Sequence, residues 1–167
     1  MKKILSALVL ITIGHFALPQ SLKNSVASGN PEVTTVAEPA TIPTYVSTKA
    51  VRSFKKAFKT VNDEKWYEMP DGYRANFTLN GVRHRMDYDK QGNWLHTIRY
   101  YDEKKLPTEV RRLVASTYLD YSVTLVEEIE TSDNKISYVI HLEGETKWIN
   151  IKVADQEINE LGTIQKS

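Results

Sequence analysis

The side chains of this chain that could do chemistry are four histidines, an acidic run and an aspartate-rich turn. The histidines are His15, His84, His96 and His141. None is spaced as in a metal-binding pair, and the last three fall on separate predicted strands, so we expect no metal site. His84 lies on the predicted core side beside Phe77, which favours a packed or hydrogen-bonded ring over a catalytic base.

The segment Asp87–Asn93 imitates the beginning of a calcium-binding loop. Its fifth position is Gln91, however, and Ile98 stands where the bidentate glutamate belongs. The segment thus lacks two of the carboxylate ligands that a tight calcium site needs, so we interpret it as a hairpin turn. We expect neither a metal nor a cofactor.

The acidic run consists of Glu127, Glu128 and Glu130, and its last two members lie on one side of a predicted strand. Paired carboxylates can do acid–base work only in a pocket that separates their pKa values, so a solvated strand face is the simpler interpretation. The sequence also has no cysteine, no G-x-S-x-G nucleophile elbow and no glycine-rich phosphate loop. We therefore assign no catalytic residue and expect that the protein is not an enzyme.

The N-terminus has the pattern of an export signal. Two lysines precede an almost uncharged apolar run at 4–18, which is too short to span a membrane comfortably. We assign residues 1–27 to a signal peptide, with cleavage after Ala27 or nearer Gln20, and residues 28–46 to a disordered leader. The protein should be periplasmic or secreted, with no stable membrane span once the signal is removed.

The charge of the chain is balanced. Lysine and arginine number 22 against 21 aspartates and glutamates, which leaves a net charge of +1. This balance disfavours a generally basic nucleic-acid-binding protein, so we expect no nucleic-acid partner.

Residues 47–167 carry alternating helical and strand patterns. Apolar residues recur at helical spacing from Ser47 or Thr48 to Val61, and again after Leu106–Pro107. Strands are predicted at 66–69, 73–79, 82–88, 94–101, 123–131, 135–143, 146–153 and 158–164. The dipeptide Asn80–Gly81 predicts a two-residue hairpin, which sets Leu79 opposite Val82 and Arg74 opposite Asp87.

The two stretches at about 48–104 and 106–164 look like copies of one unit. We therefore predict an α+β domain at 47–167 made of two helix-plus-antiparallel-sheet repeats (α-β-β-β-β twice). A helix and four strands bury little alone, so the repeats should share a core, with the helices packed on one face of the sheet. The other face would then be free.

Several of these motifs resemble those of the PepSY-like proteins, a group related to the β-lactamase-inhibitor-like (BLIP-like) fold and common as small exported proteins of Bacteroidetes-type bacteria. The motifs are the helix with Val51, Phe54 and Phe58, the Trp66 strand, the Tyr73–Phe77 strand, the Asn80–Gly81 and Asp89–Gly92 turns, and Leu106–Pro107-x-x-Val110 opening a helix. The resemblance covers about residues 49–164. It implies a fold that binds protein or peptide through the sheet face or its loops, and restraint of a secreted peptidase. No inhibitory loop matches residue by residue.

The predicted functional surface is the sheet side turned away from the helices. Its partner-binding residues would be Arg74, Asn76, Arg83, Arg85, His141, Trp148, Asn150 and Lys152. Arginine with tryptophan on an exposed sheet is typical of protein contacts, because planar groups bury area at modest entropic cost. The alternative is that Trp148 covers a sheet edge while the arginines only keep the surface soluble.

Two functions are favoured on the sequence, and an enzyme of unknown type is a third and poorer candidate. The first is an exported, non-catalytic protein-binding module that restrains a secreted peptidase or another enzyme of the cell envelope; its partner is an unidentified envelope protein or peptide. The second is a small-ligand carrier or sensor, with a pocket between helices and sheet lined by Phe54, Phe58, Tyr73 and Tyr118.

Overall fold

The computed structural model describes residues 43–167, so the predicted signal peptide and most of the predicted leader lie outside the described residues. The last residues of that leader are described. Val46 is buried beside the first helix, and the Tyr45 hydroxyl donates a hydrogen bond of 3.3 Å to the Trp66 carbonyl. Within the described range no helix has the length and apolarity that crossing a membrane would require.

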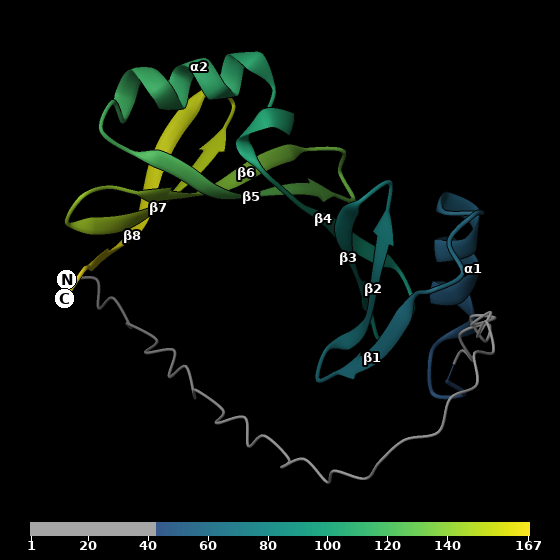
Figure 1. Cartoon of the computed structure of the whole chain (residues 1–167). Helices are drawn as coiled ribbons and strands as arrows, with labels where there is room; N and C mark the ends of the chain where they lie inside the picture. Colours follow the sequence, from purple (N-terminus) through teal and green to yellow (C-terminus); the bar gives the residue numbers. More distant parts are fainter. Residues whose placement is uncertain (1–42) are drawn as a thin grey trace, which may run out of the picture. The chain divides into compact units, whose positions relative to one another are not determined.

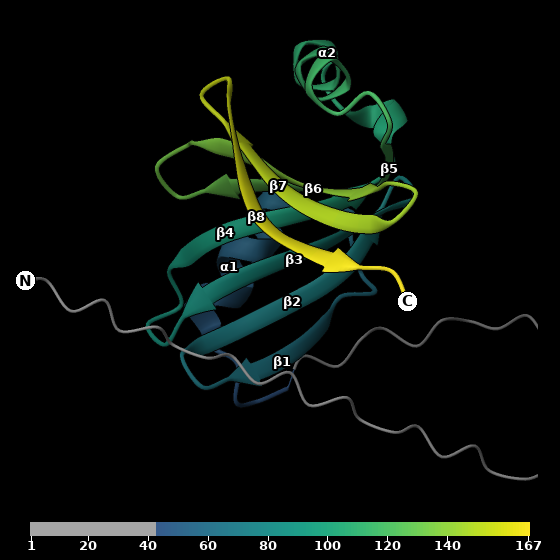
Figure 2. The ribbon, with the colours of Figure 1, turned by 90° about the vertical axis from the view of Figure 1, so that its left-hand side faces the viewer.

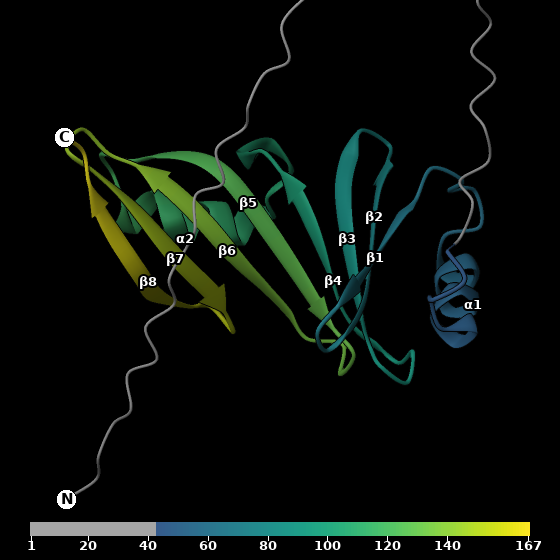
Figure 3. The ribbon, with the colours of Figure 1, turned by 90° about the horizontal axis from the view of Figure 1, so that it is seen from below.

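The described chain forms two α-helices and one antiparallel sheet of eight strands, which are hydrogen-bonded in sequence order from β1 to β8 (Figure 3). The elements are α1 (Thr48–Ala57), β1 (Lys65–Met69), β2 (Gly72–Leu79), β3 (Val82–Asp89), β4 (Trp94–Tyr101), the 3-10 turn η1 (Glu103–Lys105), α2 (Thr108–Thr117), β5 (Ser122–Thr131), β6 (Ile136–Glu143), β7 (Lys147–Ala154) and β8 (Glu157–Gln165). Every strand that the sequence predicts is present.

The predicted fold class, two helix-plus-sheet repeats with the helices packed on one face, is wrong. All eight strands belong to a single sheet, because β4 pairs with β5 from His96↔Thr131 to Tyr101↔Val126. The helices are a minor part, with ten residues each, and α2 buries only Val114. Pairing β4 with β5 satisfies backbone groups that two separate sheets would leave exposed at their edges.

The β2–β3 hairpin has the predicted register, from Leu79↔Val82 to Gly72↔Asp89. Asn80 and Gly81 both adopt positive φ angles, 51° and 72°, as a type I′ turn requires. This local turn fixes which side chains of β2 and β3 share a face.

A first hydrophobic cluster joins α1 to β1, β2 and β3, which Figure 2 shows with α1 behind them. Ala50 and Phe54 of α1 are fully buried. The Phe54 ring lies 5.0 Å from the Phe77 ring and 5.6 Å from the Trp66 ring, both edge-on. Such aromatic pairs add to the free energy gained by burying their apolar area.

A second cluster joins Leu106 and α2 to β5, β6 and β7, and Figure 1 shows α2 beside this part of the sheet. Its buried members are Leu106, Val114, Val126, Ile140, Leu142, Ile149, Ile151 and Val153. Charged residues lie between the clusters, where Arg99 of β4 pairs with Glu128 and Glu130 of β5. The described domain therefore has two small cores joined by an ion-paired strip.

A β-bulge interrupts the pairing of β3 with β4. Asp87 pairs with His96, whereas Tyr88 pairs with Trp94, which leaves Leu95 as the extra residue. An extra residue reverses the alternation of side chains along a strand. Trp94 consequently packs against the first cluster, while His96 lies on the opposite face beside Asp87.

Candidate functional site

The candidate site is the sheet face that alternates away from the two hydrophobic clusters, here called the open face. All eight predicted contact residues belong to it by register: Arg74, Asn76, Arg83, Arg85, His141, Trp148, Asn150 and Lys152. The structure brings them together in two groups, one on β2 and β3 and one on β6 and β7. Between these groups run β4 and β5, so the two groups do not touch as one patch.

A carboxylate cluster organises the first group. The buried Asp87 accepts hydrogen bonds from Arg74 Nε at 2.7 Å and Arg85 Nε at 3.0 Å, and His96 Nε2 lies 2.9 Å from its Oδ2 atom. Burial acts to raise the pKa of Asp87, but the hydrogen bonds from His96, Arg74 and Arg85 outweigh burial and hold this pKa well below its ordinary value. Arg74 and Arg85 are thus half-buried and already engaged.

Arg83 behaves differently from the other two arginines. It is exposed, and its guanidinium carbon lies 4.3 Å from the centre of the Tyr100 ring, its cross-strand neighbour on β4. No salt bridge forms between Arg83 and any carboxylate of residues 43–167. Its charge and hydrogen-bond donors remain available on a fixed aromatic support.

The second group also contains internal pairs. His141 Nε2 lies 3.0 Å from Glu127 Oε1. Trp148 is 40 % exposed, and the Lys166 ammonium lies 4.9 Å from its ring centre while also bonding Glu143 at 2.8 Å. Trp148 is therefore a partly exposed aromatic ring with a cation over it.

The predicted set of contact residues omits three residues that shape the open face, namely Asp87, Tyr100 and Glu127. Asp87 was expected opposite Arg74, but its contacts with Arg85 and His96 depend on the side chains of three strands. Tyr100 could have been found only from the β3–β4 register, which the bulge shifts.

The candidate chemical motifs have structural roles. The acidic run is not a freely solvated face, because Glu128 and Glu130 bind Arg99 and Glu127 lies beside His141. His84 is packed as predicted: its ring stacks on Phe77 at 4.9 Å and its Nδ1 lies 2.8 Å from the Val82 carbonyl oxygen. The calcium-like segment is a hairpin turn between β3 and β4. Within residues 43–167 no three metal-ligating side chains converge.

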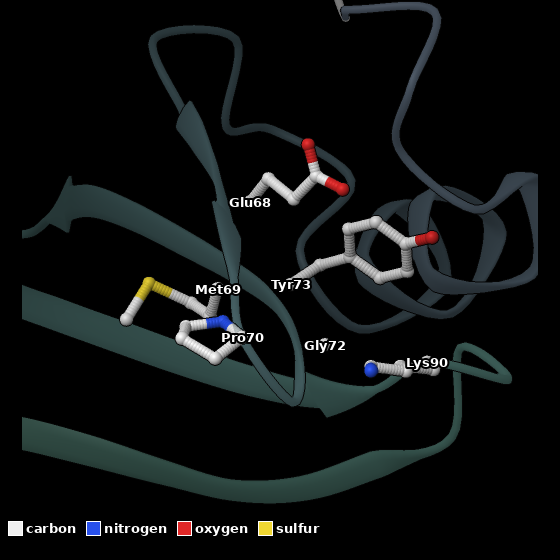
Figure 4. Close-up of a pocket in the computed structure, with 6 residues that line it drawn as sticks. All are labelled: Glu68, Met69, Pro70, Gly72, Tyr73 and Lys90. Atoms are coloured by element: carbon white, nitrogen blue, oxygen red, sulfur yellow. The ribbon is translucent and has the colours of Figure 1, made fainter.

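A shallow hollow of about 580 Å³ lies where the β1–β2 turn meets the end of β3. Figure 4 shows its lining, in which Glu68, Tyr73 and Lys90 supply the polar ends. Glu68 and Lys90 are exposed, so water screens their charges. These three groups form no hydrogen bond to one another.

The predicted ligand pocket does not form from its four residues. Phe54, Phe58 and Tyr73 belong to the first cluster, whereas Tyr118 belongs to the second. A different groove of about 500 Å³ lies between α2 and the β6–β7 side of the sheet. Its apolar lining consists of Val110, Leu113, Ile136, Tyr138, Val153 and Ala154.

The fold has counterparts among solved structures. A DUF2874 family protein from Bacteroides ovatus is 21% identical with a TM-score of 0.62, over 72% of this chain and 87% of that one. A BLIP-like protein from Bacteroides fragilis is 20% identical with a TM-score of 0.61, over 75% of this chain and 89% of that one. A Bacteroides eggerthii protein, provisionally described as periplasmic, is 17% identical with a TM-score of 0.61, over 72% and 89%.

No protein-family model and no curated protein matches the chain, so the PepSY-like resemblance stays a prediction. At these identities the likeness concerns the fold alone. The eight-stranded sheet with its two helices is therefore a BLIP-like fold.

Proposed function

We propose that this chain is an exported, non-catalytic module that binds a protein of the cell envelope through the open face and thereby restrains an enzyme such as a secreted peptidase. The observation that carries the proposal is the presence of Arg83 and Trp148, both exposed, on one face of the sheet. Arginine and tryptophan are enriched among the residues that dominate binding energy at protein interfaces.

Two further observations support the proposal. One is the BLIP-like fold, since a solved neighbour carries that description. The other is the N-terminal sequence, whose lysines and apolar run are typical of an export signal. The restraint of a peptidase rests on the PepSY-like resemblance.

Site-specific photo-crosslinking in the source cells tests this function. A benzophenone amino acid replaces Thr78 or Asn159, two exposed residues that border the open face. The matched controls replace Lys56 of α1 and Ser116 of α2, which are exposed elsewhere. We expect the same cross-linked protein from both open-face positions and none from the controls. Equal adducts from all four positions, or none from the open face, would contradict the proposal.

A second function is favoured by the groove beside α2. Its size lies within the range of small-molecule sites, and its apolar lining would accept an apolar ligand. The fluorescent probe anilinonaphthalene sulfonate should then bind the folded protein, and Leu113→Trp should abolish binding by filling the groove. Unchanged fluorescence with L113W would eliminate the carrier function.

A further inference from the structure

We infer, on the basis of the proposed function, that Arg83 stacked on Tyr100 is a carboxylate-recognition site, and that the partner is a protein segment that presents an aspartate or glutamate side chain to it. The chemistry of the partner follows from which charges of the open face are already paired within the chain.

Two carboxylates of the open face have cationic partners within the chain. Asp87 binds Arg74 and Arg85, and Glu143 binds Lys166. Glu127 lies beside His141, which carries a charge only when it is protonated. On β2, β3 and β4, the charge of this face that lies outside these pairs is that of Arg83.

Lys152 of β7 is a second cation on the open face. Arg83 and Lys152 are both exposed, and neither forms a salt bridge within residues 43–167. By register they lie in one row across the sheet, Thr78–Arg83–Tyr100–Glu127–Val139–Lys152. Glu127 lies between the two cations, so a partner with complementary charge must place its carboxylate at one of them and away from Glu127.

Arg83 is better suited to bind a carboxylate than Lys152. The Tyr100 ring, 4.3 Å from the guanidinium carbon, restricts the orientation of the Arg83 side chain before a partner arrives. A planar guanidinium donates two parallel hydrogen bonds to one carboxylate, and a side chain that is held in place loses less entropy on binding. The half-buried Tyr100 ring adds an apolar surface beside the charged contact.

The charges favour a protein over a nucleic acid. Glu127 pairs with Tyr100 across β4 and β5, two positions from Arg83 in the row, and would repel a continuous chain of phosphates. The whole protein carries a net charge of only +1. A single carboxylate on a protein surface avoids this repulsion, whereas a polyanion cannot.

Carbodiimide coupling of the full chain carrying Arg83→Lys tests the inference. This reagent joins an amine to a carboxylate only when the two are in contact, so R83K converts an ion pair into an amide that mass spectrometry can locate. The matched control is R52K, which places an amine at an exposed position of α1. We expect an amide between position 83 and an aspartate or glutamate of another protein, and none at position 52.

The variant Arg83→Gln provides a second measurement. It should lower the photo-crosslinking yield from Asn159 by about tenfold or more, because hydrogen bonds to a charged group are lost, while R52Q leaves the yield unchanged. Two results would refute the carboxylate site and leave the binding face intact, provided that position 159 still gives cross-links. One is that R83K forms no amide at position 83, and the other is that R83Q does not lower the cross-linking yield. If neither Thr78 nor Asn159 gives a cross-link while Arg83 is retained, the binding face is refuted as well.

Discussion

The Arg99 guanidinium and the Glu128 carboxylate form an ion pair of 2.8 Å between β4 and β5. This pair lies between the two hydrophobic clusters, and the Tyr101 hydroxyl donates a 2.6 Å hydrogen bond to the same carboxylate. The pairing of β4 with β5, the joint between the two halves of the sheet, is therefore stabilised by polar side-chain contacts as well as by backbone hydrogen bonds.

Replacing Glu128 should weaken this joint. Glu128→Gln removes the negative charge that both Arg99 and Tyr101 contact. We expect the free energy of unfolding to fall by about 2 kcal/mol. Glu127→Gln is the matched control, because the neighbouring carboxylate faces the other side and lies beside only His141; its cost should stay below about 1 kcal/mol. Urea unfolding measures the free energy of unfolding of both variants. An equal decrease in the two would show that the ion pair with Arg99 does not stabilise the fold more than the contact with His141.

Gly72 should tolerate no side chain. A Cβ atom there would lie 1.9 Å from the Tyr88 carbonyl oxygen, which belongs to the paired strand and cannot move away cheaply. We expect Gly72→Ala to cost about 2 kcal/mol or more. At Gly162 a Cβ atom would meet nothing within 4 Å, so Gly162→Ala should change stability by no more than about 0.5 kcal/mol. Thermal unfolding of the two variants decides the comparison.

His84 should make the fold sensitive to mild acid. Burial lowers the pKa of the ring below its ordinary value of 6.5, although the Val82 carbonyl opposes this shift. Below pH 6.5 the His84 ring is therefore protonated more readily in the unfolded chain than in the folded protein. The stability from the neutral ring is complete above pH 6.5 and is lost as the pH falls towards the folded pKa.

The measurement is the free energy of unfolding between about pH 7 and pH 5. It should fall in the unmodified protein and fall less steeply in His84→Phe, which keeps an aromatic ring against Phe77 but cannot titrate. An identical slope in H84F would show that other groups cause the acid sensitivity.

Tyr101 should make the fold sensitive to alkali. Burial raises its pKa well above the ordinary value of 10.0, and the hydrogen bond to Glu128 raises it further. Because the folded pKa is higher, the stability that neutral Tyr101 contributes is complete below pH 10 and is lost as the pH rises beyond it. Tyr101→Phe should reduce the stability loss above about pH 10, as unfolding curves at several pH values can measure. A loss as steep in Y101F as in the unmodified protein would exclude Tyr101 as its cause.

The sequence alone determined the elements and one register. The Asn80–Gly81 turn chemistry is local, so it fixed all pairs between β2 and β3 and placed Arg74, Asn76, Arg83 and Arg85 on one face. The helical stripe of α1 was equally local. Such features depend on residues close in sequence, whose backbone preferences act before any tertiary contact forms.

Only the tertiary structure decided how the strands join and what the open face contains. The paired strands β4 and β5 are separated in sequence by η1 and α2. The extra residue Leu95 changes which face of the sheet the other residues of β4 lie on, relative to a strand without the bulge. Asp87 thereby meets His96, and Tyr100 lies under Arg83. These contacts follow from hydrogen-bond register and packing between distant segments, and a one-residue slip would move each side chain to the other face.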